Sequence, residues 1–164
     1  MPKVIIVNQD DEPIGLEVRN KLKSEDTYRV SALWITNSNG DVLLAQRKAN
    51  KKIEPLCWGP AVSGTVEEGE DYESNIYKEM EEELGLTNFK LKLFKKFSPQ
   101  SLGGNYFVQL YTLKEDLDIN SLKLQEEELE SVAWFNAESL KQQIRNKPEK
   151  FVASAPFWEI VGLL

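Results

Sequence analysis

Histidine is absent from this 164-residue sequence, and cysteine occurs once, as Cys57. Without histidine, Ser-His-Asp catalysis and most zinc sites are excluded, and a single cysteine excludes a disulfide within the chain. Any catalysis must therefore use carboxylates, amines, hydroxyls, backbone groups or a bound metal ion. A single cysteine is typical of proteins in a reducing compartment, and we therefore expect a cytoplasmic protein.

Long apolar runs and a basic excess are missing as well. No run of eighteen apolar residues is present, so we expect no transmembrane helix, and the first apolar run is too short for a signal peptide. Acidic residues outnumber basic ones by 27 to 20. Because phosphate backbones need basic surface, we expect no nucleic-acid partner and no membrane partner. The length suits a single domain over residues 1–164, as a monomer or homodimer, with a hairpin extension over about 1–27.

The acidic charge is concentrated in one stretch, Gly64–Leu86. Nine acidic residues and one basic residue, Lys78, lie between Glu67 and Glu83. The rest of the chain, with 18 acidic and 19 basic residues, is nearly neutral. Crowded carboxylates repel one another unless a cation lies among them. A hard divalent cation with oxygen ligands is the candidate, with Mg²⁺ preferred and Mn²⁺ as a substitute.

The same stretch predicts a helix over Tyr72–Leu84. Asp71 is a suitable N-cap, and Gly85 suits the left-handed residue that ends a helix. A core-facing stripe is predicted by the apolar residues Ile76, Met80 and Leu84, with Tyr77 beside them.

A different face of this helix carries the carboxylates. Glu79, Glu82 and Glu83 are spaced at i, i+3 and i+4, so they share one side. Gly64, with Gly69 and Glu70, is expected in the loop that leads to the helix. A backbone carbonyl and three helix carboxylates are therefore expected to converge on one or more metal ions.

Apolar patterns elsewhere predict the remaining elements. We expect strands at Val4–Val7, Leu16–Val18, Tyr28–Ile35, Val42–Gln46, Phe89–Phe97, Tyr106–Leu113 and Val132–Phe135. Helices are expected at Ala137–Arg145, capped by Asn136, and at Ser154–Leu164, with irregular connections at 98–105 and 114–130. Strands around a central helix, with further helices at the end, predict an α/β fold in which helices sandwich a mixed sheet.

The acidic stretch resembles the signature box of the Nudix hydrolases. That box reads Gly, five residues, Glu, seven residues, Arg-Glu, an apolar residue, any residue, Glu-Glu, any residue, Gly, an apolar residue. The matches are Gly64, Glu70, Glu79, Met80, Glu82, Glu83, Gly85 and Leu86. The departure is Lys78, where the family has Arg. A solvated acidic helix is the alternative, but it leaves both glycines and the apolar stripe unexplained.

The resemblance implies a fold and an activity. The fold is an α/β/α sandwich with a mixed central sheet, and the segment 28–52 followed by Trp58 resembles the subgroup related to isopentenyl-diphosphate isomerase. The activity is metal-dependent hydrolysis of a pyrophosphate bond in a nucleoside diphosphate linked to another group. By resemblance, the carbonyl near Gly64 also binds metal, and Glu79 is the favoured base.

Two further groups are candidates for the site. A basic loop with Arg47, Lys48, Lys51 and Lys52 is expected to bind substrate phosphates, with a solvated loop as the alternative. Family members commonly draw another metal ligand or base from a loop before the late strand. The acidic run 126–128 lies there, and we favour Glu128, with Glu127 and a solvated acidic loop as alternatives.

Lys78 is the third candidate, because the family's Arg is taken to orient the box carboxylates. Lys78 lies four residues before Glu82 and is expected to reach back to Glu70, which would then pair with it and not bind metal. An ammonium keeps the charge of a guanidinium but loses its planar two-point grip. We therefore expect a working but slow enzyme.

Two other functions compete with hydrolysis. By resemblance, the isomerase needs a cysteine four residues after Trp58, where this chain has Val62, and it needs histidines that are absent here. The second alternative is a Nudix-fold binding or sensor module with impaired catalysis, which the change at Lys78 allows.

Overall fold

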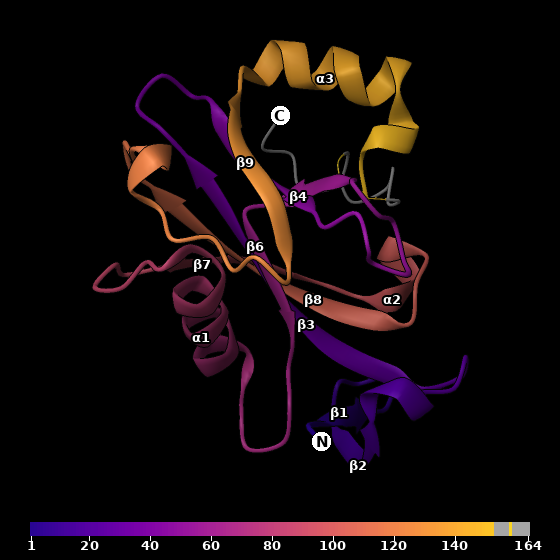
Figure 1. Cartoon of the computed structure of the whole chain (residues 1–164). Coiled ribbons are helices and arrows are strands. Elements are labelled where there is room, and N and C mark those ends of the chain that lie inside the picture. The colour runs from indigo at the N-terminus through magenta and orange to yellow at the C-terminus, as the bar shows by residue number, and fades with distance from the viewer. Residues whose placement is uncertain (153–157, 159–164) are drawn as a thin grey trace.

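The computed structural model describes residues 1–152 and Trp158. Within them, nine strands form one mixed sheet with helices on both faces (Figure 1). The strands are β1 (Lys3–Val7), β2 (Pro13–Val18), β3 (Thr27–Thr36), β4 (Val42–Arg47), β5 (Trp58–Pro60), β6 (Val62–Thr65), β7 (Lys92–Phe97), β8 (Tyr106–Lys114) and β9 (Leu129–Phe135). The helices are α1 (Tyr72–Leu84), α2 (Pro99–Leu102) and α3 (Ala137–Asn146), with short 3-10 turns η1 (Arg19–Lys21), η2 (Ile119–Ser121) and η3 (Pro148–Lys150).

Strand β3 is the centre of the sheet. It pairs antiparallel with β1, β4 and β6, and parallel with β8. The other strands extend the sheet from these: β2 pairs with β1, β7 with β8, and both β5 and β9 with β4. Because successive side chains of a strand point to opposite faces, Leu33 and Ile35 join one apolar core, and Ala32 and Trp34 join the other.

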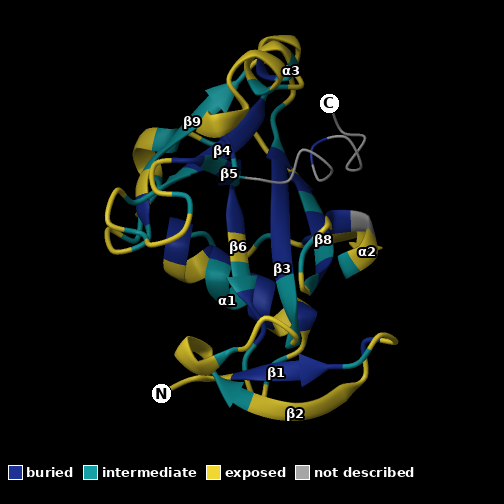
Figure 2. Cartoon of the chain, turned by 90° about the vertical axis from the view of Figure 1, so that its right-hand side faces the viewer, coloured by how far each residue is buried: buried dark blue, intermediate teal, exposed yellow. Residues whose placement is uncertain are grey.

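The two cores lie on opposite faces of the sheet. Helix α1 covers one core with the predicted stripe of Ile76, Met80 and Leu84. The other core includes Leu102 of α2, Leu140 of α3 and the buried Trp158. Figure 2 shows the buried central strands between α1 and α3. The predicted α/β/α sandwich with a mixed sheet is confirmed.

Several local predictions differ from the structure. Strands β5 and β6 were not predicted, because the eight residues 58–65 include two glycines and a proline, which disguise a strand pattern. The predicted loop 98–105 contains α2, and β9 begins at Leu129, inside the predicted connection 114–130. The expected last helix, Ser154–Leu164, lies outside the described residues except for Trp158. None of the helices in the described part of the chain is long and apolar enough to cross a membrane.

Candidate active site

Helix α1 is fixed at both ends by the predicted caps. At its start, the Asp71 carboxylate accepts from the Ser74 backbone N–H at 2.7 Å, and the Ser74 hydroxyl accepts from the Asp71 N–H at 2.9 Å. At its end, Gly85 adopts a φ of 68°, and its N–H donates to Glu81. A side chain at Gly85 would be strained in that left-handed conformation. The caps therefore fix where the helix begins and ends, and with that the positions of its carboxylates.

Strand β6 brings Gly64 against the side chain of Glu79. Gly64 lies opposite Ser31 in the pairing of β6 with β3, directly beneath α1. A Cβ at Gly64 would lie 2.6 Å from Cδ and 2.8 Å from Oε1 of Glu79, which is closer than real contacts allow. Only glycine fits here, and the Glu79 carboxylate consequently lies on the bare backbone of β6.

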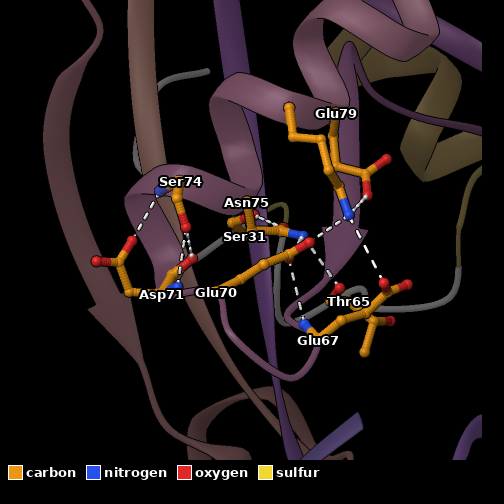
Figure 3. A network of polar contacts seen from close by, with 9 residues as sticks. Ser31, Thr65, Glu67, Glu70, Asp71, Ser74, Asn75 and Glu79 are labelled. Atoms are coloured by element: carbon orange, nitrogen blue, oxygen red, sulfur yellow. Dashed lines mark hydrogen bonds and ion pairs between the residues drawn. The ribbon is translucent and has the colours of Figure 1, made fainter. Parts of the chain in front are cut away.

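Lys78 lies among three carboxylates, those of Glu67, Glu70 and Glu79, which are labelled in Figure 3. Its ammonium donates to Glu70 and lies 3.6 Å from Glu79 Oε1 and 3.7 Å from Glu67 Oε2. Burial lowers the pKa of Lys78, but the hydrogen bond and charge of Glu70 outweigh it and raise that pKa above its ordinary value. The predicted pair of Lys78 with Glu70 is present, so Glu70 is held by a side chain of this helix.

Asn75 completes that arrangement, although it was not among the predicted site residues. Its side chain is fully buried; its Nδ2 donates to Glu70 Oε2 at 2.7 Å and to the Thr65 carbonyl at 3.1 Å, and its Oδ1 accepts from the Ser31 hydroxyl. These bonds tie α1 to β3, to β6 and to the loop before the helix (Figure 3). The available signal was a polar residue beside Ile76, on the buried side of the predicted helix.

The three helix carboxylates differ in exposure. Glu83 is buried, Glu79 is partly buried and Glu82 is exposed. Burial raises the pKa of Glu83 well above its ordinary value, and the charges of Glu79 and Glu128 add to the rise. Burial also raises the pKa of Glu79, although Lys78 opposes the change. Without a cation beside them, the charged forms of Glu79 and Glu83 are therefore disfavoured. Across residues 1–152 and Trp158, no three Asp, Glu or Cys side chains gather closely enough to hold a metal ion by themselves.

The connection before β9 docks on the end of α1 and places Glu128 at the site. The backbone N–H groups of Lys123 and Gln125 donate to the carbonyls of Leu84 and Glu83, at 3.1 and 3.0 Å. Glu128, partly buried, accepts from Lys51 Nζ at 2.5 Å. Of the acidic run, Glu126 and Glu127 are exposed.

The four basic residues of the loop 47–52 differ in the groups that they contact. The Arg47 guanidinium donates to the Ile53 carbonyl at 3.1 Å, and Lys48 lies 3.7 Å from Glu130. Lys52 is exposed and makes no hydrogen bond or ion pair with the described residues. Lys51 differs, because it reaches Glu128 and its charge lowers the pKa of Glu83. Of the four predicted basic residues, the structure brings Lys51 to the carboxylates.

The comparisons with known proteins agree with this arrangement. The model of the NUDIX domain matches residues 26–155. An uncharacterised Nudix hydrolase from Nostoc sp. is 30% identical over 149 residues, covering 88% of this chain and 87% of the relative. The crystal structure of DR0079 from Deinococcus radiodurans superposes with a TM-score of 0.83 at 25% identity, covering 98% of this chain and 97% of that one.

Two of the relatives are named for activities on prenyl diphosphates. A prenyl-diphosphate phosphatase from Methanosarcina mazei is 28% identical over 146 residues, covering 88% of this chain and 85% of the relative. An isopentenyl-diphosphate isomerase from Corynebacterium diphtheriae is 23% identical over 159 residues, covering 90% of this chain and 86% of the relative. The resemblance to the subgroup around the isomerases is thus confirmed. With the domain model matching most of its length and the box folded as a capped helix against β6, this chain belongs to the Nudix hydrolase family.

Proposed function

We propose that this hydrolase cleaves a pyrophosphate bond in a nucleoside diphosphate linked to another group, with the help of a divalent metal ion. The observation that carries the proposal is the contact between Glu79 and Gly64. A partly buried carboxylate on a bare backbone strand, beside the buried Glu83, gives a compact set of oxygen donors. These are the residues that match the signature box.

The residues present fit Mg²⁺, with Mn²⁺ as a substitute. The donors are carboxylate and carbonyl oxygens, which hard cations prefer, and the raised pKa values of Glu79 and Glu83 indicate negative charge that a cation would stabilise. The described residues form no closed three-carboxylate cluster, so the ion would keep water or substrate oxygens among its ligands. Mg²⁺ usually binds to proteins in this way. We assign the protein ligands to Glu79, Glu82, Glu83 and the Gly64 carbonyl.

Each side chain then has a defined task. A bound divalent metal ion neutralises phosphate oxygens and lowers the pKa of a bound water. Glu79 accepts the proton of the attacking water, and Lys78 holds its carboxylate in place from 3.6 Å. Glu70 holds Lys78 by accepting from its ammonium at Oε1, and Asn75 holds Glu70 by donating to its Oε2. Glu128, from the connection before β9, supplies a further ligand or base near Glu83.

The named relatives favour a second candidate substrate. The relative from Methanosarcina mazei is named as a prenyl-diphosphate phosphatase. A prenyl diphosphate carries the same diphosphate as a nucleoside diphosphate derivative, so the carboxylates and Lys51 would serve both. The isomerase activity is less suited, because Val62, fully buried, stands where the isomerases place a cysteine and the chain has no histidine.

A substrate panel tests the proposal. The protein is incubated with nucleoside diphosphate derivatives and with prenyl diphosphates, with and without Mg²⁺, and the products are separated and quantified. We expect Mg²⁺-dependent cleavage of a nucleoside diphosphate derivative, lost in Glu79→Gln. Cleavage of prenyl diphosphates alone would establish the second candidate, and binding of a nucleotide without turnover would establish the binding or sensor module.

A further inference from the structure

The Lys51–Glu128 ion pair joins two chain segments that are distant in sequence. Lys51 comes from the loop between β4 and β5, and Glu128 comes from the connection before β9, 77 residues later. Their side chains are 24% and 44% exposed, so water reaches the pair. An ion pair exposed to this degree contributes little to stability and exchanges readily with other ions. The pair is therefore poorly suited to hold the fold.

The backbone on both sides is held without the side chains. The Lys51 N–H donates to the Lys48 carbonyl, the Lys48 N–H donates to the Glu128 carbonyl, and each distance is 3.2 Å. The Glu128 N–H donates to Gln125, and the Gln125 N–H donates to Glu83 in α1, both at 3.0 Å. A continuous series of backbone bonds thus joins the basic loop to the box helix. The two side chains can separate while these backbone bonds stay formed.

We propose that this ion pair is a latch that a diphosphate opens, and that Lys51 is the residue that selects substrates by their diphosphate. In the free protein the ammonium neutralises Glu128. When a diphosphate enters, its several negative oxygens outcompete one carboxylate for the ammonium, and Glu128 is released toward the site. The flexible four-carbon stem of lysine allows this movement, which a rigid guanidinium would restrict. The inference rests on the proposed function, because it assumes a substrate with a diphosphate.

If the pair is a latch, removing Lys51 and removing the charge of Glu128 should change diphosphate binding in opposite directions. Removing Lys51 removes the ligand for the phosphate, whereas removing the charge of Glu128 removes a competitor for Lys51. A merely structural pair would behave differently, because losing either partner would loosen the same two segments and weaken binding. The controls are Lys90→Ala, which removes an exposed charge outside the basic loop, and Glu127→Gln, which removes an exposed carboxylate next to Glu128.

Binding of methylenediphosphonate, a non-hydrolysable diphosphate, is measured by calorimetry without metal. We expect Lys51→Ala to weaken binding by about tenfold or more, as loss of a charged hydrogen bond does. Glu128→Gln should tighten it by at least about threefold, and both controls should stay within about twofold. Weaker binding in Glu128→Gln, or equal tightening in Glu127→Gln, would overturn the latch.

Turnover separates this inference from the proposed function. If the protein is active, Lys51→Ala should raise KM by about tenfold with kcat nearly unchanged, because Lys51 holds substrate and transition state alike. A fall in kcat at constant KM would contradict the latch and leave the hydrolase activity standing. If no substrate is cleaved but the binding pattern appears, the proposed function fails and the diphosphate latch remains.

Discussion

Gly64 and Glu79 occupy one space: the side chain of Glu79 fills the volume that a Cβ at Gly64 would need. The glycine belongs to β6 and the glutamate to α1, so the close approach of strand and helix depends on the absence of one carbon atom. This contact explains in steric terms why a glycine and a glutamate 15 positions apart stand together in the box.

Gly64→Ala tests that contact. The added methyl group must displace the Glu79 carboxylate, and a misplacement of about 1 Å can cost on the order of 10²-fold in rate. We expect kcat to fall by about that factor, with about 1–3 kcal/mol lost in unfolding free energy from overpacking. Gly15→Ala is the matched control, since a Cβ there meets no atom within 4 Å. An unchanged kcat in Gly64→Ala would show that Glu79 need not lie there.

Glu83→Gln and Glu82→Gln test the carboxylates as metal ligands. Each removes a charge and keeps the shape, so turnover should fall by orders of magnitude in a protein that stays folded. The two should differ in thermal stability without metal, because Glu83 is buried and Glu82 is exposed. We expect the Tm of metal-free Glu83→Gln to equal or exceed that of the parent, and that of Glu82→Gln to be unchanged. Most of the activity surviving in both variants would exclude the proposed metal site.

Lys78 variants test whether this residue orients the site. Lys78→Ala leaves Glu70, Glu67 and Glu79 without their shared cation, so we expect kcat to fall by about tenfold or more. Lys78→Arg restores a planar grip on two carboxylates, and we expect kcat to rise above that of the parent. Metal affinity and Tm are measured alongside. If Lys78→Ala turns over at the parental rate with metal still bound, Lys78 orients nothing.

A pH dependence of stability should arise at Asp11, whose carboxylate contacts Tyr72 at the start of α1. Its carboxylate is buried and accepts from Arg29 Nε at 2.7 Å, from the Tyr72 hydroxyl at 2.9 Å and from Lys96. Burial raises the pKa of Asp11, but the hydrogen bonds from Arg29, Lys96 and Tyr72 outweigh it and lower that pKa below its ordinary value. The charged form is therefore favoured by folding. Its contribution is complete above the ordinary pKa of 3.8 and is lost as the pH falls through the folded value.

Asp11→Asn isolates this contribution. Asparagine tolerates the left-handed φ of 59° found here, so the change removes charge and keeps the turn. We expect a loss of about 1–3 kcal/mol at pH 7, measured by denaturant unfolding. The difference from the parent should shrink below about pH 4, because the parental carboxylate then becomes protonated. A difference that is constant from pH 7 to pH 3 would contradict this assignment.

The sequence predicts the fold best where the signal is local. Helix α1 was predicted with its observed bounds, because caps and an apolar stripe lie within its own residues. Strands β5 and β6 escaped prediction because they are short and are defined by pairing with β4 and β3. The mixed sheet followed from the number and order of the strong strands.

In the candidate site, too, contacts between residues close in sequence were predictable and contacts between distant residues were not. The pair of Lys78 with Glu70 was predictable, since both residues lie in the box. The buried bond of Asn75 with Ser31 was not, because the two residues are 44 positions apart and meet only when α1 packs on β3. The roles of Glu79, Glu82, Glu83 and Glu128 in catalysis remain predictions for the experiments above.

The parallel pairing of β3 with β8 constrains how the chain can fold. Tyr28 is paired with Tyr106, and Thr36 with Lys114, so each pair closes a loop of 78 residues that contains the whole box. Parallel pairs so distant in sequence form slowly, because the loop must be closed before the contacts are gained. During synthesis, the central strand cannot acquire this partner until residue 114 has left the ribosome. Until then the acidic segment has been synthesised with its carboxylates crowded, but the sheet that α1 packs on is incomplete.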